Sequence, residues 1–230
     1  MTVLATPADL LDGPLSVAMR DGTRTEHEAA EGSVFMEELL AGRIEEEGYA
    51  DYLKRLRRVY RTMEQVGHDH RSDPIVAAVL DPALERLASI EADIAFWSAD
   101  PKGDVASAAT DEYVARLEAT ASWGGLFAAH HYTRYLGDLS GGQAIGRILA
   151  REFGLEGDAG IAFYGFAGIA KPKPYKDAYR AQLDALGFDR AQKERVVEEV
   201  KVAFGLNQAL FEELDIALCL RARRPQAPRR

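Results

Sequence analysis

The chain has only one cysteine, Cys219, among its 230 residues. A single cysteine forms no internal disulfide and provides no set of thiolates for a metal ion. Residues 1–20 also lack the basic region followed by an apolar region that defines a signal peptide. These two absences indicate a reducing compartment, and we expect a cytoplasmic protein.

Long apolar runs and an excess of positive charge are missing as well. No segment approaches the ~20 apolar residues that cross a bilayer, and residues 221–230 (RARRPQAPRR) contain no apolar tail. We therefore expect no membrane anchor. The net charge of −9 argues against nucleic acid as the main partner, because binding to a phosphate backbone requires clustered positive charge.

The chain is instead rich in helical periodicity. Apolar residues make up 47% and charged residues 28%, as in ordinary soluble proteins, and apolar positions recur every three or four residues. We predict an all-α, single-domain fold over residues 15–220, with an N-terminal extension at 1–14 and a flexible tail at 221–230. The expected helices cover residues 15–30, 44–67, 75–98, 111–119, 123–153, 175–186 and 190–220, and residues 99–110 are expected to form a loop.

A histidine lies on the apolar side of the first predicted helix. Leu15, Met19, Thr23 and His27 recur at four-residue spacing, so His27 falls on the inward stripe. Glu31 lies four residues further on the same face, about 5–6 Å away between Cβ atoms. A metal-ligating histidine commonly offers its second ring nitrogen to such a neighbour. A buried histidine bonded to a backbone carbonyl, beside a solvated Glu31, explains this pattern at least as well.

Four glycines lie within one predicted helix, at residues 131–147 (HYTRYLGDLSGGQAIGR). Each costs roughly 0.8–1 kcal/mol relative to alanine in a helix interior. At ~100° per residue, Gly137, Gly141 and Gly142 share one arc with Arg134 and Asp138. One face is therefore stripped of side chains, which suits either a large flat ligand or a closely packed helix. A phosphate loop is disfavoured, because no strand precedes the segment and no Gly-Lys-Ser/Thr ending follows.

Two segments carry a resemblance to a known family. Residues 132–143 (YTRYLGDLSGGQ) closely resemble the distal-helix signature of the heme oxygenase family, and residues 25–31 (TEHEAAE) resemble its proximal helix. The resemblance extends over residues 15–214. It implies a helical fold with heme b, which is both cofactor and substrate, between the two helices. It also implies cleavage of heme to biliverdin, carbon monoxide and ferrous iron, with oxygen as co-substrate.

The resemblance assigns roles on both sides of the heme. It implies that His27 is the axial ligand of the iron and that Glu31 is the carboxylate near it. Gly137, Gly141 and Gly142 would form the distal wall, where bare backbone restricts the shape of iron-bound oxygen.

A proton-delivery network is implied on the distal side. Asp138 matches the aspartate that orders water near the bound oxygen, and Arg134 and Tyr60 match its partners. The ordered water delivers the protons that direct oxidation to the porphyrin edge. For Arg134 the alternative is a surface ion pair with Asp138, and for Tyr60 it is core packing.

Several further residues match heme contacts of the family. Lys176 and Arg180, four residues apart on one helix face, match contacts to the heme propionates, and Arg20 and Tyr132 are further candidates. The alternative for the basic residues is solvent-facing charge. A late helix is implied to place two residues against the heme, with core packing and capping as alternatives: Phe204 on the macrocycle and Asn207 at a polar edge. No family role transfers to the remaining histidines, His68, His70, His130 and His131.

Two rival functions remain at this point, a heme carrier or sensor and a helical interaction domain without a cofactor. Asp138 favours the enzyme, because a carrier has no evident need for a proton-delivery group. No segment resembles a flavin or nicotinamide fold, so an external ferredoxin or flavoprotein reductase must supply the electrons. The basic residues 54–61 (KRLRRVYR) are a candidate docking surface for that partner.

Overall fold

The computed structural model describes residues 7–222, without the side chains of residues 7–9, Glu31 and residues 218–222. Within this part of the chain all regular structure is helical, which confirms the all-α prediction. Cys219 has no described side chain, and most of the predicted tail lies outside the described residues. None of the helices among residues 7–222 combines the length and apolarity that a bilayer crossing requires.

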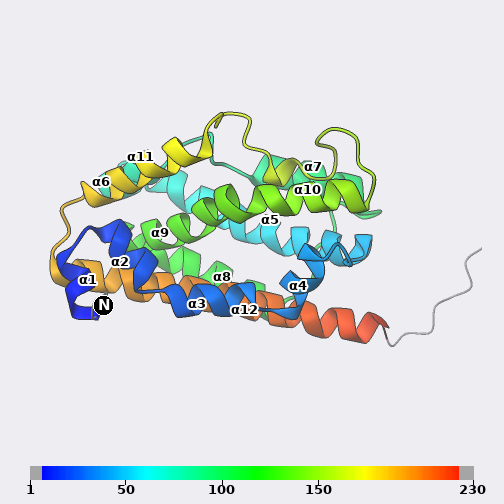
Figure 1. The fold of residues 1–230 in the computed structure, drawn as a ribbon, viewed down its shortest axis with the longest axis horizontal. Coiled ribbons are helices and arrows are strands. Elements are labelled where there is room, and N and C mark those ends of the chain that lie inside the picture. Colours follow the sequence, from blue (N-terminus) through cyan, green and yellow to red (C-terminus); the bar gives the residue numbers. More distant parts are fainter. Residues whose placement is uncertain (1–6, 223–230) are drawn as a thin grey trace, which may run out of the picture.

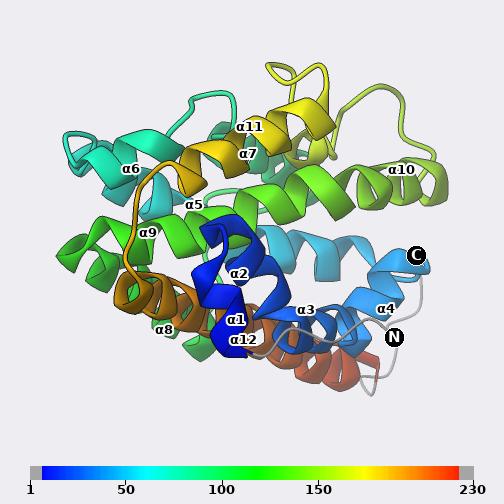
Figure 2. The ribbon, with the colours of Figure 1, turned by 60° about the vertical axis from the view of Figure 1, so that its left-hand side comes forward.

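Long helices form three levels of the fold (Figure 1). A continuous helix at residues 124–152 lies between α11 on one side and α12 on the other, an order seen in both views (Figure 2). Helix α5 packs against α7 and α8, and α12 packs against α9, α3 and α4. The helices are α1 (Pro7–Asp12), α2 (Leu15–Asp21), α3 (Arg24–Glu31), α4 (Val34–Leu40), α5 (Glu46–Asp69), α6 (Pro74–Val79), α7 (Leu87–Trp97), α8 (Ala108–Ala119), α9 (Gly124–His131), α10 (Gln143–Glu152), α11 (Pro172–Asp184) and α12 (Arg190–Ala222), with short 3₁₀ turns η1 (Thr120–Ser122) and η4 (Ala162–Tyr164).

The prediction of one continuous first helix is wrong, because the segment divides into α2 and α3 at Gly22 and Thr23. The Thr23 hydroxyl donates to the Met19 carbonyl at 2.6 Å, which offers the backbone an alternative to the helical bond. A Cβ at residue 22 would lie 2.6 Å from the Ala18 carbonyl oxygen and 3.1 Å from Val197 Cγ1. Glycine therefore allows the chain to turn closely over α12.

Other helix boundaries also differ from the prediction. The helix expected at 75–98 is interrupted between α6 and α7, where Pro82 follows an Asp81 carboxylate that accepts the Ala83 amide at 2.9 Å. Helix α4 was not predicted, although Ser33 caps it by accepting the Met36 amide at 3.3 Å. The loop expected through residue 110 ends earlier, because Ser107 caps α8. Helix α1 lies within the predicted N-terminal extension and packs against α2 and α12.

A buried ion cluster joins three of these helices. Glu199 of α12 is 3% exposed, and its carboxylate accepts hydrogen bonds of 2.8 Å from both His130 of α9 and Arg116 of α8. Burial alone raises the pKa of Glu199, but the bonds from His130 and Arg116 outweigh it and lower that pKa to about 2. The ionised carboxylate therefore stabilises the packing of α12 against α8 and α9.

Replacing this carboxylate gives a pH-dependent loss of stability. Because the folded pKa of Glu199 lies below the ordinary value of 4.5, its contribution is present above pH 4.5 and disappears as the pH falls to about 2. We expect Glu199→Gln to lower the free energy of unfolding by about 3 kcal/mol at neutral pH. In urea unfolding, the difference from the wild type should shrink across that acidic window.

The neighbouring Glu198 provides a matched control. Its side chain is 61% exposed and forms a surface ion pair with Lys201, so Glu198→Gln should change stability by less than about 0.5 kcal/mol. A loss at Glu199→Gln that stays constant from neutral pH down to about 2 would contradict the role of the ionised carboxylate.

Candidate functional site: a cleft beside a bare helical face

Most of the residues singled out in the sequence meet at a cleft between α3 and α12 on one side and the helix at residues 124–152 on the other. Its volume is about 690 Å³ with the open mouth included, within the range of small-molecule sites. The predicted residues that line it are His27, Arg134, Gly137, Asp138, Gly141, Gly142, Phe204 and Asn207. The structure thus brings together eight residues that the sequence selected separately.

The wall of the cleft opposite α3 is wound partly as π-helix. The helix at residues 124–152 contains two such segments, η2 (Tyr132–Leu136) and η3 (Asp138–Gly142), on either side of Gly137. π-Helical turns are rare and are found frequently at functional sites. The segment predicted as one helix at 123–153 is confirmed as continuous, but its winding loosens at the glycines.

The glycines leave open space in front of this wall. A Cβ built on Gly137 or Gly141 would meet no atom within 4 Å, so no protein packing requires glycine at either position. Gly142 differs, because its Cβ would lie 3.0 Å from the ring of Tyr164. All three glycines of the predicted bare face line the cleft, with open space at Gly137 and Gly141 and the ring of Tyr164 behind Gly142.

His27 lies on α3 at the other side of the cleft. Its imidazole is exposed and meets the ring of Phe204 edge to face, with 5.3 Å between centroids. The predicted inward stripe is confirmed for Leu15, Met19 and Thr23, which are buried, but His27 is exposed in the cleft. Glu31 occupies the last residue of α3, and its side chain lies outside the described part.

A buried network surrounds the carboxylate of Asp138. The Tyr60 hydroxyl donates to Asp138 Oδ2, and Arg134 donates from Nε to that hydroxyl at 3.1 Å. Arg134 also donates from an Nη to Asn207 Oδ1 at 2.6 Å and lies 3.8 Å from Asp138 Oδ1. Asn207 therefore faces Arg134, a partnership that its sequence context did not reveal. Core packing alone does not describe Tyr60, whose hydroxyl belongs to this network.

The surroundings of the Asp138 carboxyl shift its pKa upward. Burial raises its pKa, although Arg134 and the hydrogen bond from Tyr60 act in the opposite direction. Burial likewise raises the pKa of Tyr60 well above its ordinary value, so the phenol stays protonated and remains a donor. The site can therefore hold a proton on, or release one from, a fixed carboxyl beside the bare glycine face.

The four other predicted polar contacts, Arg20, Tyr132, Lys176 and Arg180, are not among the residues that line the cleft. Lys176 of α11 donates to the Ser140 hydroxyl at 2.8 Å, next to Gly141. Burial raises the pKa of Tyr132, while the positive charges of Arg180 and Arg20 act to lower it. Two of these cations also hold carboxylates: Arg20 pairs with Asp21 at 2.8 Å and Arg180 with Asp177 at 3.3 Å.

The predicted docking surface at residues 54–61 is wrong. Arg57 is 7% exposed and donates to the carbonyl oxygens of Pro101 and Gly103, each at 2.7 Å. Other cations of the stretch are also engaged: Arg55 with Glu213, Arg58 with Asp111, and Arg61 with Glu91. These cations hold helices and loops together and do not form a free basic surface.

Apolar and aromatic side chains that the sequence motifs did not identify complete the cleft. Their periodicity is that of ordinary core positions, so nothing in the sequence separates residues facing a cleft from residues facing the interior. The missed lining residues include Met36, Tyr52, Phe163, Tyr164 and Phe211.

Comparisons with known proteins agree on one family. The family model described as heme oxygenase matches residues 13–213. Heme oxygenase 1 of Synechocystis sp. is 37% identical over 206 residues, covering 87% of this chain and 85% of the relative. Heme oxygenase 1 of Homo sapiens is 36% identical over 211 residues, covering 90% of this chain and 73% of the relative.

Solved structures show the same similarity. The crystal structure of Synechocystis heme oxygenase-1 in complex with heme has a TM-score of 0.83 and 35% identity, covering 91% of this chain and 98% of that chain. Synechocystis heme oxygenase-2 in complex with heme and NO has a TM-score of 0.85 and 31% identity, covering 94% and 95%.

Alanine at two neighbouring glycines should change stability in opposite directions. Gly141→Ala adds a methyl to open space and removes a flexible residue from a helix, so we expect the free energy of unfolding to rise by about 0.5–1 kcal/mol. Gly142→Ala presses against Tyr164 and should lower it by about 1–2 kcal/mol. Urea unfolding of the ligand-free proteins measures both. Equal effects at the two positions would show that the open space at Gly141 is absent in solution.

Proposed function

The chain belongs to the heme oxygenase family, and we propose that it binds heme in this cleft and cleaves it to biliverdin, carbon monoxide and ferrous iron. We assign this function to the cleft because open space lies in front of Gly137 and Gly141, opposite His27. A flat macrocycle needs two facing walls without intervening side chains, and the glycines provide one of them. Heme fits this space as the substrate.

On the α3 side, His27 is the proposed axial ligand of the iron. Its imidazole reaches the cleft from a helix that packs on α12, and the ring of Phe204 restricts its rotation through the edge-to-face contact. A ligand held in one orientation binds without further loss of rotational freedom. Glu31 is the proposed carboxylate near it. Bound heme supplies the iron at which oxygen, the proposed co-substrate, is activated.

On the distal side, Asp138 is the proposed proton-delivery group. Tyr60 and Arg134 hold its carboxylate beside the bare face, and Asn207 in turn holds Arg134. The raised pKa of Asp138 favours transient protonation, which suits a group that relays protons through water. Tyr60 and Arg134 are proposed to keep this carboxylate oriented, while Gly137, Gly141 and Gly142 exclude side chains from the reacting centre.

Arg20, Tyr132, Lys176 and Arg180 are proposed to bind the heme propionates. The present partners of Lys176 and Arg180 are a hydroxyl and an exposed carboxylate, which a propionate can replace. Electrons are proposed to come from a ferredoxin or flavoprotein reductase, which docks elsewhere than residues 54–61. The low cysteine content continues to favour a cytoplasmic location.

Added imidazole should compensate for the loss of the proposed axial ligand. We expect His27→Ala to weaken hemin binding about tenfold or more and to alter the Soret band, because the iron loses its protein ligand. Added imidazole should restore the spectrum. His68→Ala is the matched control, since His68 pairs with Glu85 outside the cleft lining. A wild-type spectrum for His27→Ala without imidazole would contradict the assignment.

Neutralising the distal carboxyl should separate binding from turnover. We expect Asp138→Asn to bind hemin with nearly wild-type affinity but to form biliverdin about 10²-fold more slowly, because the relayed proton is lost. The assay follows the decay of the Soret band and bilin formation with an electron source in air, with catalase present. Asp104→Asn, an exposed site, is the control. Wild-type bilin formation by Asp138→Asn would remove this residue from the mechanism.

A further inference from the structure

Helix α11 carries two tyrosines directly before its two proposed propionate contacts. Tyr175 precedes Lys176 and Tyr179 precedes Arg180, so the pairs repeat at four-residue spacing. Tyr179 is 2% exposed, whereas Lys176 bonds to Ser140 on the distal helix and Arg180 pairs with the exposed Asp177. Any rotation or sliding of α11 therefore moves both cations at once.

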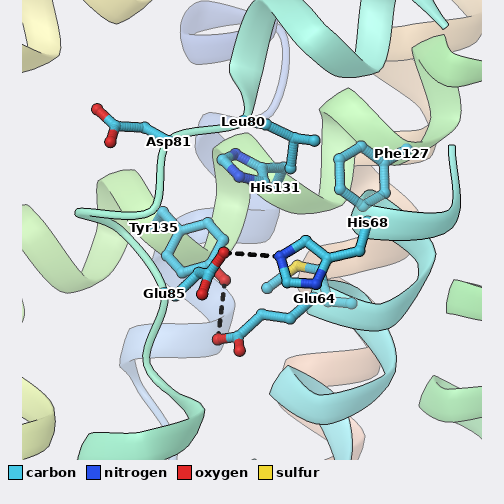
Figure 3. Close-up of a pocket in the computed structure, with 9 residues that line it drawn as sticks. Glu64, His68, Leu80, Asp81, Glu85, Phe127, His131 and Tyr135 are labelled. Atoms are coloured by element: carbon cyan, nitrogen blue, oxygen red, sulfur yellow. Dashed lines mark hydrogen bonds and ion pairs between the residues drawn. The ribbon is translucent and has the colours of Figure 1, made fainter. Parts of the chain in front are cut away.

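Tyr179 is held by a buried histidine for which the family resemblance provides no role. His131 Nδ1 and the Tyr179 hydroxyl share a hydrogen bond of 2.7 Å, and the two rings are nearly parallel, at 5°. His131 is 2% exposed, with the ring of Tyr135 at 4.4 Å and that of Phe127 at 5.5 Å. Figure 3 shows His131 enclosed by Leu80, Phe127 and Tyr135.

The bond joins α11 to the distal wall at a defined point. His131 is the last residue of α9, and the π-helical segment η2 begins at the next residue and leads to Gly137 and Asp138. Burial lowers the pKa of His131 to about 3, so the imidazole is neutral near pH 7. A neutral ring keeps this bond without placing a charge beside the proposed propionate contacts.

A second bond fixes the other end of the tyrosine pair. The Tyr175 hydroxyl donates to Asp81 Oδ2 at 2.7 Å, and the second carboxylate oxygen of Asp81 accepts the Ala83 amide. Asp81 lies between α6 and α7, so α11 is tied both to this loop and to α9. The pair of bonds fixes the rotation of α11 about its axis, because a helix held at two points one turn apart cannot rotate independently.

We propose that His131 is a positioning residue, which sets the in-plane orientation of heme by holding Tyr179 and hence Lys176 and Arg180. This inference rests on the proposed function of the cleft. The propionates anchor one edge of the macrocycle, and the wall with Asp138 directs oxidation at another. Because His131 connects the two, it determines which meso carbon meets the activated oxygen.

The test compares variants that remove only this hydrogen bond. Tyr179→Phe deletes one hydroxyl, and His131→Phe keeps an aromatic ring, so both retain the packing. We expect the share of minor bilin isomers, separated by chromatography, to rise roughly threefold to tenfold, the effect of losing one hydrogen bond. Proton NMR of the heme methyl groups in the ferric cyanide complex should show a second in-plane orientation, independently of turnover.

Rescue and control variants separate positioning from loss of structure. His131→Gln offers an amide to Tyr179 and should restore the wild-type isomer distribution. Gln182→Ala, on an exposed position of α11, should leave both readouts unchanged. Thermal unfolding of each variant shows that the measured protein is folded.

The outcomes also distinguish this inference from the proposed function. If the wild type forms bilin and both Tyr179→Phe and His131→Phe keep its isomer distribution and its NMR pattern, the inference is overturned and the proposed function stands. If the wild type takes up no hemin, both fail.

Discussion

The buried guanidinium of Arg134 is the group on which the cleft depends. It bonds to Tyr60 on α5 and to Asn207 on α12, and it faces Asp138 one turn along its own helix. A buried cation is stable only when its hydrogen bonds are satisfied, so the three helices must keep one relative register. That register places the glycines opposite α3 and holds the distal carboxyl in place.

The sequence was most informative where residues act through their backbone or through an uncommon string. The glycine spacing predicted the bare face, and the string at residues 132–143 identified the family. Helix interruptions were harder to predict from the sequence. Gly22 has the pattern of a glycine inside a helix, and only its packing against α12 shows why the chain turns there. The basic residues at 54–61 looked like a surface because their carbonyl and carboxylate partners, such as Gly103 and Glu213, are distant in sequence.

The glycine wall of the cleft differs from one position to the next in the substitutions that it tolerates. At Gly141 a side chain would enter the open space of the cleft without meeting another group, whereas at Gly142 the ring of Tyr164 already occupies that space. The two adjacent glycines are therefore under different structural constraints. The aromatic residues behind them, including Tyr52 and Phe211, read as core in the sequence because they belong to both the core and the cleft.

The partners of Arg134 also determine when the cleft can form during synthesis. Tyr60 precedes it by 74 positions and Asn207 follows it by 73. Contacts of such sequence separation close large loops and form late in folding. Until α12 has left the ribosome, Arg134 lacks its amide partner and the ring of Phe204 is missing beside His27. The complete site therefore exists only after nearly the whole chain has been made.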